Sequence, residues 1–262
     1  MYIKKMKVII LAGGHGSRLG YLSDYKPKPM IKIGDKPILW HIMKIYSSYG
    51  FNDFIIAIGD KGEVIKDYFN NFQIYNNDFQ VNIGENKINI LNKSEEENWT
   101  VSLVDTGVNS LKGSRIKKLE KYLKSETNLL TYGDGVANID IKKLLKYHVS
   151  HGKTLTISGV FPPSRFGEIE ENNGKVVSFS EKSQTSSGLI NGGFMVFEKK
   201  MLDALSISDD CDFEFRVLEK LVKLNEVMVY KHEGHWECMD NQRDMEHLNN
   251  LWNSKKAFWK IW

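Results

Sequence analysis

The chain has 262 residues with 36 basic and 33 acidic side chains, which gives a net charge of +3 at pH 7. A charge this close to balance excludes the broad basic surface of a protein that binds nucleic acid non-specifically. Cys211 and Cys238 are not spaced as a metal or redox pair, so we expect free thiols in a reducing cytoplasm. No stretch has the pattern of a signal peptide or a membrane span, and we expect a soluble cytoplasmic protein without membrane or nucleic-acid partners.

Short apolar runs alternate with amphipathic segments, which predicts an α/β fold with a Rossmann-like, mostly parallel sheet flanked by helices. In chain order, the expected buried strands are Val8–Leu11, Phe54–Ile58, Val101–Val104 and Leu129–Tyr132. The expected helices are Ile38–Tyr49, Glu63–Phe69, Ile116–Leu123, Ile139–His151, Phe213–Leu224 and Gln242–Trp252. No repeat or linker divides the chain, so we expect one domain over residues 1–262.

The segment from residue 154 to residue 197 has a different pattern, in which short strand-like runs follow one another. These runs are Thr154–Val160, Glu168–Glu170, Val176–Phe179 and Gly193–Phe197. Asn173-Gly174 between two of them is a strong hairpin signal. We therefore expect a small antiparallel annex on the main sheet, which would form a wall for a second, sugar-containing substrate.

A glycine-rich turn follows the first strand. Gly13, Gly14 and Gly16 let the chain bend sharply, so that backbone N–H groups can converge on anionic oxygens. Arg18 and Lys28 add positive charge that a tight turn alone would not need. The segment lacks the Gly-Lys-Ser/Thr of a P-loop and the glycine spacing of a dinucleotide site. We predict that it binds the polyphosphate of a nucleotide.

Asp134 lies between two glycines just after the strand Leu129–Tyr132. This is the carboxyl edge of the sheet, where open α/β folds bind ligands. Magnesium takes one or two protein carboxylates and completes its octahedron with phosphate oxygens and water. We predict that Asp134 and Asp240 hold Mg²⁺. The alternative is that Asp134 caps a turn and that Asp240 caps the helix beginning near Gln242.

Together these motifs resemble those of the sugar-1-phosphate nucleotidylyltransferases, which implies a GT-A-like nucleotidyltransferase fold. The matching stretches are Leu11–Leu19, Lys26–Met30, Tyr132–Asp134, Glu181–Lys182 and Asn191–Gly193. Within this superfamily, Lys36–Met43 and Phe161–Gly167 resemble the corresponding segments of glucose-1-phosphate cytidylyltransferases. The motifs follow one another in a consistent order from about Met6 to Trp262, which makes chance agreement a poor explanation.

The resemblance implies that CTP reacts with α-D-glucose 1-phosphate to give CDP-glucose and pyrophosphate, with Mg²⁺ as cofactor, for O-antigen or other surface polysaccharides. A phosphate oxygen attacks the α-phosphorus in line, so neither an enzyme nucleophile nor a general base is required. The resemblance also implies a homo-oligomer. The alternatives are a different sugar 1-phosphate, or a different triphosphate such as UTP or dTTP.

Two other classes of protein fit less well. A dehydrogenase would need properly spaced glycines and an acidic residue at the end of the second strand, and the chain has neither in register. A silent nucleotide-sugar sensor would be expected to lose the metal carboxylates or the phosphate cations. These residues are all present in this chain.

The resemblance also implies roles for individual residues. Arg18, Lys28 and Asp134 would be catalytic, and Asp134 and Asp240 would bind the metal. The sugar phosphate would contact Glu181, Lys182, Asn191 and Gly192. Arg115 would meet the base or ribose. The nucleotide would contact Leu11, Ala12, Gly13, Gly14, His15, Gly16, Ser17, Arg18, Lys28, Thr106, Gly107, Arg115, Gly133 and Asp134.

Three further features are given expectations of their own. His148 and His151 lie three residues apart on one helix, and we expect a solvated face rather than a metal site. Arg216 would lie near the sugar pocket and would suit a more anionic sugar phosphate. The aromatic tail Ala257–Trp262 is expected to pack on the body or, preferably, on a partner subunit.

Overall fold

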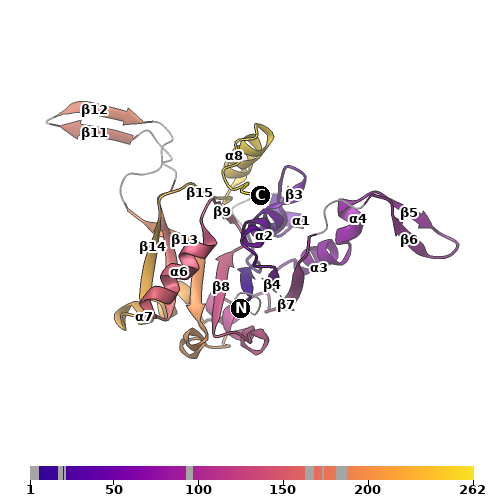
Figure 1. Cartoon of the computed structure of the whole chain (residues 1–262), viewed down its shortest axis with the longest axis horizontal. Helices are drawn as coiled ribbons and strands as arrows, with labels where there is room; N and C mark the ends of the chain where they lie inside the picture. The colour runs from indigo at the N-terminus through magenta and orange to yellow at the C-terminus, as the bar shows by residue number, and fades with distance from the viewer. Residues whose placement is uncertain are drawn as a thin grey trace.

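The computed structural model describes residues 6–16, 20, 22–92, 97–162, 168–172, 174–180 and 188–262. Its centre is a seven-stranded sheet, in which β13 runs antiparallel to both neighbours and the other adjacent pairs are parallel (Figure 1). In spatial order the strands are β14 (Val227–His232), β10 (Leu155–Val160), β13 (Ile190–Glu198), β8 (Thr127–Tyr132), β1 (Val8–Leu11), β4 (Asp53–Ile58) and β7 (Thr100–Asp105). The predicted mostly parallel α/β sheet is confirmed.

Strand β1 shows why the apolar runs could be identified as buried strands. Val8 and Ile10 lie in the hydrophobic cluster on one face of the sheet, and Ile9 and Leu11 lie in the cluster on the other face. Because successive side chains of a strand point to opposite faces, a strand covered on both sides needs a continuous apolar run. The four expected strands all belong to the sheet, and their ends extend by at most two residues beyond the predicted bounds.

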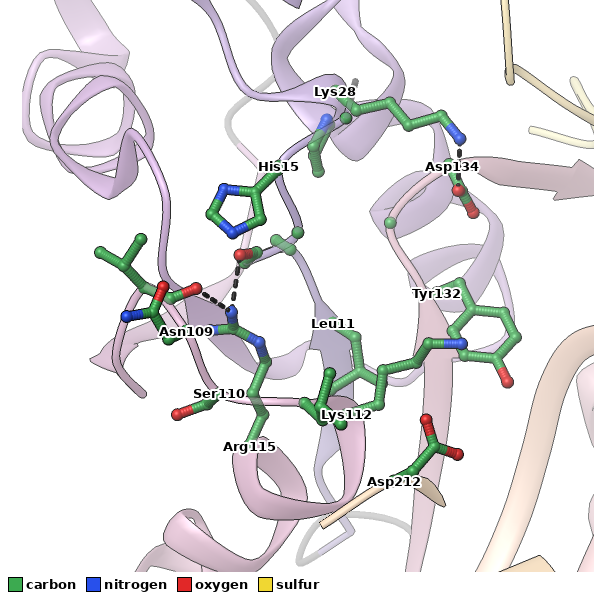
Figure 2. A pocket seen from close by; sticks show the side chains of 18 of the residues that line it. Leu11, His15, Lys28, Asn109, Ser110, Lys112, Arg115, Tyr132, Asp134 and Asp212 are labelled. Atoms are coloured by element: carbon green, nitrogen blue, oxygen red, sulfur yellow. Dashed lines mark hydrogen bonds and ion pairs between the residues drawn. The ribbon is translucent and has the colours of Figure 1, made fainter. Parts of the chain in front are cut away.

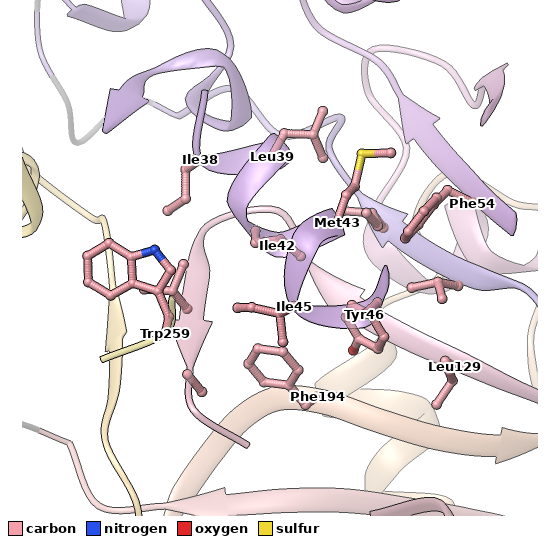
Figure 3. Packing of buried hydrophobic residues seen from close by; sticks show 14 of the residues in the cluster. Ile38, Leu39, Ile42, Met43, Ile45, Tyr46, Phe54, Leu129, Phe194 and Trp259 are labelled. Carbon is pink, nitrogen blue, oxygen red and sulfur yellow. The ribbon is translucent and has the colours of Figure 1, made fainter. Parts of the chain in front are cut away.

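Helix α2 (Ile38–Ser48) covers one face of the sheet. It begins directly after Pro37, whose fixed extended backbone suits the residue before a helix. Figure 3 shows its apolar side chains packed against Phe54, Leu129 and Phe194, which come from three strands of the sheet. Full burial of each large aliphatic side chain contributes about 1.5–3 kcal/mol.

The remaining helical segments surround the sheet and its loops. Helix α6 begins at Ile141 rather than Ile139, because the Asp140 side chain caps it by accepting from the Lys143 N–H. The predicted helix from Ile116 begins four residues earlier, at Lys112, and the predicted helix from Phe213 is a π-helical stretch followed by a short α-helix. The other segments are α1 (Leu22–Tyr25), η3 (Lys28–Met30), α3 (Gly62–Asn70), α4 (Phe72–Asn76), α5 (Lys112–Lys118), η4 (Glu120–Tyr122), α6 (Ile141–His151), η5 (Lys199–Ala204), η6 (Phe213–Leu218), α7 (Glu219–Lys223) and α8 (Gln242–Asn253).

The predicted annex is smaller than its expected bounds. Only β11 (Glu168–Asn172) and β12 (Lys175–Ser180) form a separate hairpin, whereas β10 and β13 are strands of the main sheet. The error has a physical cause, since an antiparallel strand in a mixed sheet has the same local pattern as one in a separate sheet. The other two-stranded pairs are β2 (Lys32–Ile33) with β3 (Lys36–Pro37), β5 (Phe79–Asn82) with β6 (Lys87–Ile90), and β9 (Gly135–Ala137) with β15 (Trp236–Cys238).

The C-terminal segment packs on the body of its own chain. Trp259 is fully buried in the cluster beneath α2, and its indole N–H donates to Nδ1 of His41 at 3.3 Å. The other ring nitrogen of His41 lies 2.9 Å from the carbonyl oxygen of Ile33, so it must carry the proton and donate. The preferred expectation of packing on a partner subunit is therefore wrong for Trp259.

His148 is also buried, contrary to the expected solvated face. Its Nδ1 lies 2.8 Å from the Thr156 hydroxyl and its Nε2 lies 3.0 Å from a carboxylate oxygen of Glu198. His151 contacts the same hydroxyl at 2.7 Å. The two histidines thus hold α6 against β10 and β13.

Among the described residues, no helix is both long enough and apolar enough to cross a bilayer.

Candidate active site

A cavity of about 420 Å³ opens at the carboxyl edge of the sheet, within the size range of small-molecule sites. The glycine turn after β1 and the Gly133-Asp134 turn after β8 meet there, because β1 and β8 are parallel neighbours. Figure 2 shows the side chains that surround it. The lining residues are Leu11, Ala12, Gly13, Gly14, His15, Gly16, Lys28, Pro29, Val108, Asn109, Ser110, Leu111, Lys112, Arg115, Tyr132, Gly133, Asp134, Asp212 and Asp240.

Two carboxylates and one ammonium group meet at the upper edge of this cavity. Lys28 Nζ lies 2.7 Å from an oxygen of Asp134 and 2.5 Å from an oxygen of Asp240. Burial alone would lower the pKa of Lys28, but the Asp134 and Asp240 carboxylates raise it above its ordinary value. The ammonium therefore stays charged at neutral pH. The predicted convergence of Asp134, Asp240 and Lys28 is present.

A short pair of strands brings Asp240 to Asp134. β9 begins directly after Asp134 and pairs with β15, so that Cys238 lies opposite Gly135. The Met239 N–H then donates to the Asp134 carbonyl oxygen at 2.9 Å. Asp240 does not cap the following helix, since Asn241 is the N-cap of α8 and forms a capping box with Asp244. The alternative of a capping role for Asp240 is therefore wrong.

The two carboxylates fit a divalent cation. The Lys28 ammonium lies within hydrogen-bonding distance of both Asp134 and Asp240, which shows that a single positive centre can contact both side chains. Within the described ranges, no group of three or more His, Cys, Asp or Glu side chains is arranged as a closed metal cage. Two carboxylates beside an open cavity are the donor set expected for magnesium that also binds substrate phosphates.

Arg115 holds the glycine turn in place. Its guanidinium is almost fully buried and donates to the carbonyl oxygens of Gly13 and Gly107, both at 2.7 Å, and to the Thr106 hydroxyl, also at 2.7 Å. Further carbonyl contacts are to Val108 at 3.1 Å and Ile58 at 3.3 Å. Arg115 therefore bridges the loops that follow β1, β4 and β7, which the sequence alone did not indicate.

The glycine at position 13 is required by this contact. A Cβ atom built on Gly13 would lie 2.2 Å from Nη1 of Arg115, whereas one on Gly14 would meet nothing within 4 Å. Gly16 adopts a left-handed φ of 63°, a conformation that glycine reaches without steric cost. Thr106 and Gly107 contact Arg115 and do not line the cavity, and their predicted contact with the nucleotide stays a prediction.

The comparisons with known proteins agree with this geometry. Residues 7–257 match the family described as "Nucleotidyl transferase". The chain belongs to this family. Glucose-1-phosphate cytidylyltransferase of Salmonella typhimurium is 45% identical over 258 residues, which cover 98% of this chain and 100% of that protein. D-glycero-alpha-D-manno-heptose 1-phosphate guanylyltransferase of Campylobacter jejuni is 31% identical over 221 residues, covering 84% and 88% of the two chains.

Solved structures share the fold. The structure of HddC from Yersinia pseudotuberculosis complexed with GMP-PN superposes with a TM-score of 0.67 and 23% identity, and the match covers 94% of this chain and 99% of that chain. This similarity supports the nucleotidyltransferase fold predicted from the sequence. In this chain, both antiparallel contacts of β13 lie within the main sheet.

On the other side of this nucleotidyl transferase cavity, Tyr132 forms a polar cluster. Its hydroxyl lies 3.1 Å from the Asn191 amide nitrogen and 2.8 Å from a Glu214 carboxylate oxygen. Lys112 also donates to Glu214, and its ammonium lies 5.0 Å from the Tyr132 ring centroid. Asn191 thus contacts the cavity only through Tyr132. Gly192, which was predicted to contact the sugar phosphate, accepts a hydrogen bond from the Trp236 indole N–H through its carbonyl oxygen at 2.8 Å.

Some predicted residues are found elsewhere, and some lining residues were missed. Arg216 pairs with Asp210 at 3.0 Å on the surface and does not line the cavity, and its expected place near the sugar pocket stays a prediction. Ser17, Arg18, Glu181 and Lys182 lie outside the described residues, as do positions 163–167 of the matching motif. The lining residues missed by the sequence analysis include Val108–Lys112, whose nearness to Arg115 in the sequence was the available signal.

Proposed function

We propose that this chain transfers the cytidylyl group of CTP to α-D-glucose 1-phosphate and releases pyrophosphate and CDP-glucose. The observation that carries the proposal is the meeting of Asp134, Asp240 and Lys28 beside the glycine turn. The identity of 45% to a protein named glucose-1-phosphate cytidylyltransferase, over its full length, supports the choice of both substrates. A phosphoryl-transfer site requires positioning and charge neutralisation rather than a covalent nucleophile, and the cavity supplies both.

Asp134 and Asp240 are the residues that would hold Mg²⁺. A bound magnesium ion neutralises phosphate charge and orients the phosphates of the two substrates. With the carboxylates engaged in this way, the Lys28 ammonium is available to the triphosphate. Lys28 lies on the 3₁₀ turn η3, whose Pro29 and Met30 are buried, so the origin of the lysine side chain is fixed relative to the sheet.

The glycine turn would hold the triphosphate through its backbone N–H groups. Arg115 fixes the Gly13 carbonyl oxygen, so the peptide units of the turn have a set orientation before a nucleotide binds. Lys28 would then stabilise the charge that develops on the departing pyrophosphate.

The attacking phosphate oxygen is already ionised at neutral pH, so His15 has no proton to remove. Its imidazole lies 3.5 Å from the carboxylate of Asp60.

The resemblance supports roles that the described residues do not test. Arg18 and Ser17 would contact the triphosphate, and Glu181 and Lys182 would contact the sugar phosphate. Assembly as a homo-oligomer and a cytoplasmic location are further predictions. The oligomeric state can be measured by light scattering of the purified protein.

A pyrophosphate-release assay tests the function. It crosses CTP, UTP, dTTP, ATP and GTP with a panel of sugar 1-phosphates, in the presence of Mg²⁺ and of excess chelator. We expect Mg²⁺-dependent turnover with CTP and glucose 1-phosphate. A preference of more than tenfold for another base would reject the cytidylyltransferase assignment.

The principal alternative is the same reaction with another triphosphate or another sugar 1-phosphate. The 31% identity to a protein named as a heptose 1-phosphate guanylyltransferase shows that relatives of this chain bear names with other substrates. The same assay separates these alternatives. Nucleotide binding without turnover on any sugar 1-phosphate would instead indicate a silent sensor.

A further inference from the structure

The cavity has two sides with different chemistry. Arg115 and Asn109 lie on one side of it in Figure 2, and Tyr132 lies on the other, with Lys112 extending across the floor toward the Tyr132 ring. The proposed function places the nucleotide on the glycine turn that Arg115 holds. In-line transfer requires the attacking phosphate oxygen to approach the α-phosphorus opposite the departing pyrophosphate. With the nucleotide on the glycine turn, the side of the cavity lined by Tyr132 and Lys112 is the part left for the sugar phosphate.

Four elements contribute one polar side chain each to the cluster around Tyr132, of which Tyr132 and Lys112 line the cavity. Tyr132 ends β8, Asn191 is on β13, Glu214 is on η6, and Lys112 begins α5. Gly193, with a φ of 82°, makes room for the tyrosine ring, since a Cβ there would lie 2.7 Å from Cδ2 of Tyr132. The ring is therefore enclosed by neighbouring backbone, and its hydroxyl is held at a fixed place.

The direction of each hydrogen bond in this cluster can be assigned. The Asn191 side-chain oxygen accepts from the Gly193 N–H at 2.9 Å, so the Asn191 amide nitrogen is the atom that donates to the Tyr132 hydroxyl. The Tyr132 hydroxyl in turn donates to the Glu214 carboxylate. Burial and the Glu214 charge raise the pKa of Tyr132, which keeps its hydroxyl protonated as a donor. Lys112 is the second donor to the same carboxylate oxygen.

This arrangement fixes a carboxylate beside the approach path of the sugar. Tyr132 and Lys112 both donate to one carboxylate oxygen of Glu214, Oε1, and a carboxylate can also accept at its second oxygen. Hydrogen bonds from neutral hydroxyls to an ionised acceptor are stronger than those between neutral groups. A hexose ring presents several hydroxyl donors.

We propose that Glu214, held in place by Lys112 and Tyr132, accepts a hydrogen bond from a ring hydroxyl of the sugar 1-phosphate and selects an uncharged hexose. This inference rests on the proposed function and extends it to a residue for sugar specificity. Lys112 and Asp212 line the cavity, and Glu214 pairs with Lys112, so a uronic acid would meet two carboxylates and one ammonium on this side.

The test combines variants with substrate analogues. kcat and KM are measured for the wild type, Glu214→Gln and Lys112→Met with CTP, glucose 1-phosphate, its 2-, 3-, 4- and 6-deoxy analogues, and glucuronic acid 1-phosphate. Lys117→Met is the matched control on the same helix, because Lys117 pairs with Glu120 at 2.8 Å and does not line the cavity. Thermal unfolding of every variant verifies that it is folded.

We expect Glu214→Gln to raise KM for glucose 1-phosphate by about tenfold or more and to leave KM for CTP within about twofold. With the wild type, one deoxy analogue should have a KM raised by the same factor. With Glu214→Gln, removal of that hydroxyl should raise KM no further, because the variant and the analogue remove the same contact. Discrimination against glucuronic acid 1-phosphate should fall in Glu214→Gln. Lys112→Met should raise KM for the sugar phosphate, and Lys117→Met should change neither KM.

The proposal would be overturned if the effects of Glu214→Gln and of hydroxyl removal on KM were additive for every deoxy analogue. It would also be overturned if Glu214→Gln changed KM for CTP and KM for the sugar phosphate equally. The proposed function is judged separately by the wild type alone. If the wild type prefers another sugar 1-phosphate, the same experiment is run with the deoxy analogues of that sugar, and the prediction for Glu214 is unchanged. If no folded Glu214→Gln is obtained, Glu214→Asp is measured in its place. It must raise KM for the sugar phosphate and leave KM for CTP nearly unchanged, and an unchanged KM for the sugar phosphate rejects the proposal.

Discussion

Asp134 and Asp240 accept hydrogen bonds from the same Lys28 ammonium, at 2.7 and 2.5 Å, although they follow different strands in distant parts of the chain. The antiparallel pairing of β9 with β15 produces this meeting, since it sets Cys238 opposite Gly135. Two negative charges at one point repel each other unless a cation lies between them. The site is therefore arranged around a positive centre, and this relationship leads to the first prediction.

Asp134→Asn and Asp240→Asn should each keep the fold and lower kcat/KM by on the order of 100-fold or more, because each removes a charged ligand of the proposed magnesium site. The measurement is steady-state turnover across a Mg²⁺ titration, together with a thermal melt. Asp53→Asn is the matched control, since Asp53 pairs with Lys7 at 2.7 Å at the start of β4. Near-normal turnover in either of the first two variants would refute the metal assignment.

Gly13→Ala should weaken nucleotide binding strongly, because the added methyl group would lie 2.2 Å from the Arg115 guanidinium. Forcing an extra methyl group into a packed site costs about 1–3 kcal/mol. Gly14→Ala should have a smaller effect, since its methyl group meets nothing within 4 Å. Calorimetric titration with CTP compares the two variants. Equal losses of affinity would show that Arg115 does not define the turn.

Arg115→Lys should destabilise the protein by about 2 kcal/mol and raise KM for the triphosphate. Lysine keeps the charge but cannot reach the carbonyl oxygens of Gly13, Gly107 and Val108 at once, so buried acceptors lose their donors. Urea unfolding and initial-rate kinetics measure the two effects. A lysine variant with unchanged stability would mean that these contacts are dispensable.

The buried His41 predicts a loss of stability in acid. Burial lowers the pKa of His41 to about 4, so the unfolded chain takes up a proton near pH 6.5 that the folded chain binds only near pH 4. The contribution of His41 to the free energy of unfolding is fully present above about pH 6.5. It falls as the pH drops toward 4, by about 3 kcal/mol in total.

Urea unfolding of the wild type and of His41→Gln between pH 7 and pH 4 tests this dependence. Glutamine can still donate to the Ile33 carbonyl oxygen but does not titrate, so its curve should fall less steeply. The pKa values of the buried His148 and His232 are also lowered, so some slope should remain in the variant. Identical slopes for the two proteins would contradict the assignment to His41.

Much of the fold could be predicted because local pattern determines it. The continuous apolar run Val8–Leu11, followed by glycines that mark a turn, predicts a strand covered on both faces, and the structure confirms it. The membership of β10 and β13 in the main sheet could not be predicted, because strand partners are set by tertiary packing. The burial of Trp259 within its own chain depends on tertiary packing in the same way.

The candidate site was predictable in part for the same reason. Asp134 was identifiable from its place between glycines after a strand, but its meeting with Asp240 depends on β9 and β15, which have only three residues each. Arg115 was expected, from the resemblance, to meet the base or ribose, and its burial among backbone carbonyl oxygens depends on loops that only the fold brings together. Lys112 was missed because its partners, Tyr132 and Glu214, come from two other elements.

The most direct test of the central claim is a crystal structure of the chain with Mg²⁺ and a non-hydrolysable CTP analogue. We expect magnesium at about 2.0–2.1 Å from carboxylate oxygens of both Asp134 and Asp240, with the triphosphate on the glycine turn and the Lys28 ammonium moved from the carboxylates to the phosphates. A metal ion bound without these two residues, or a nucleotide outside this cavity, would contradict it.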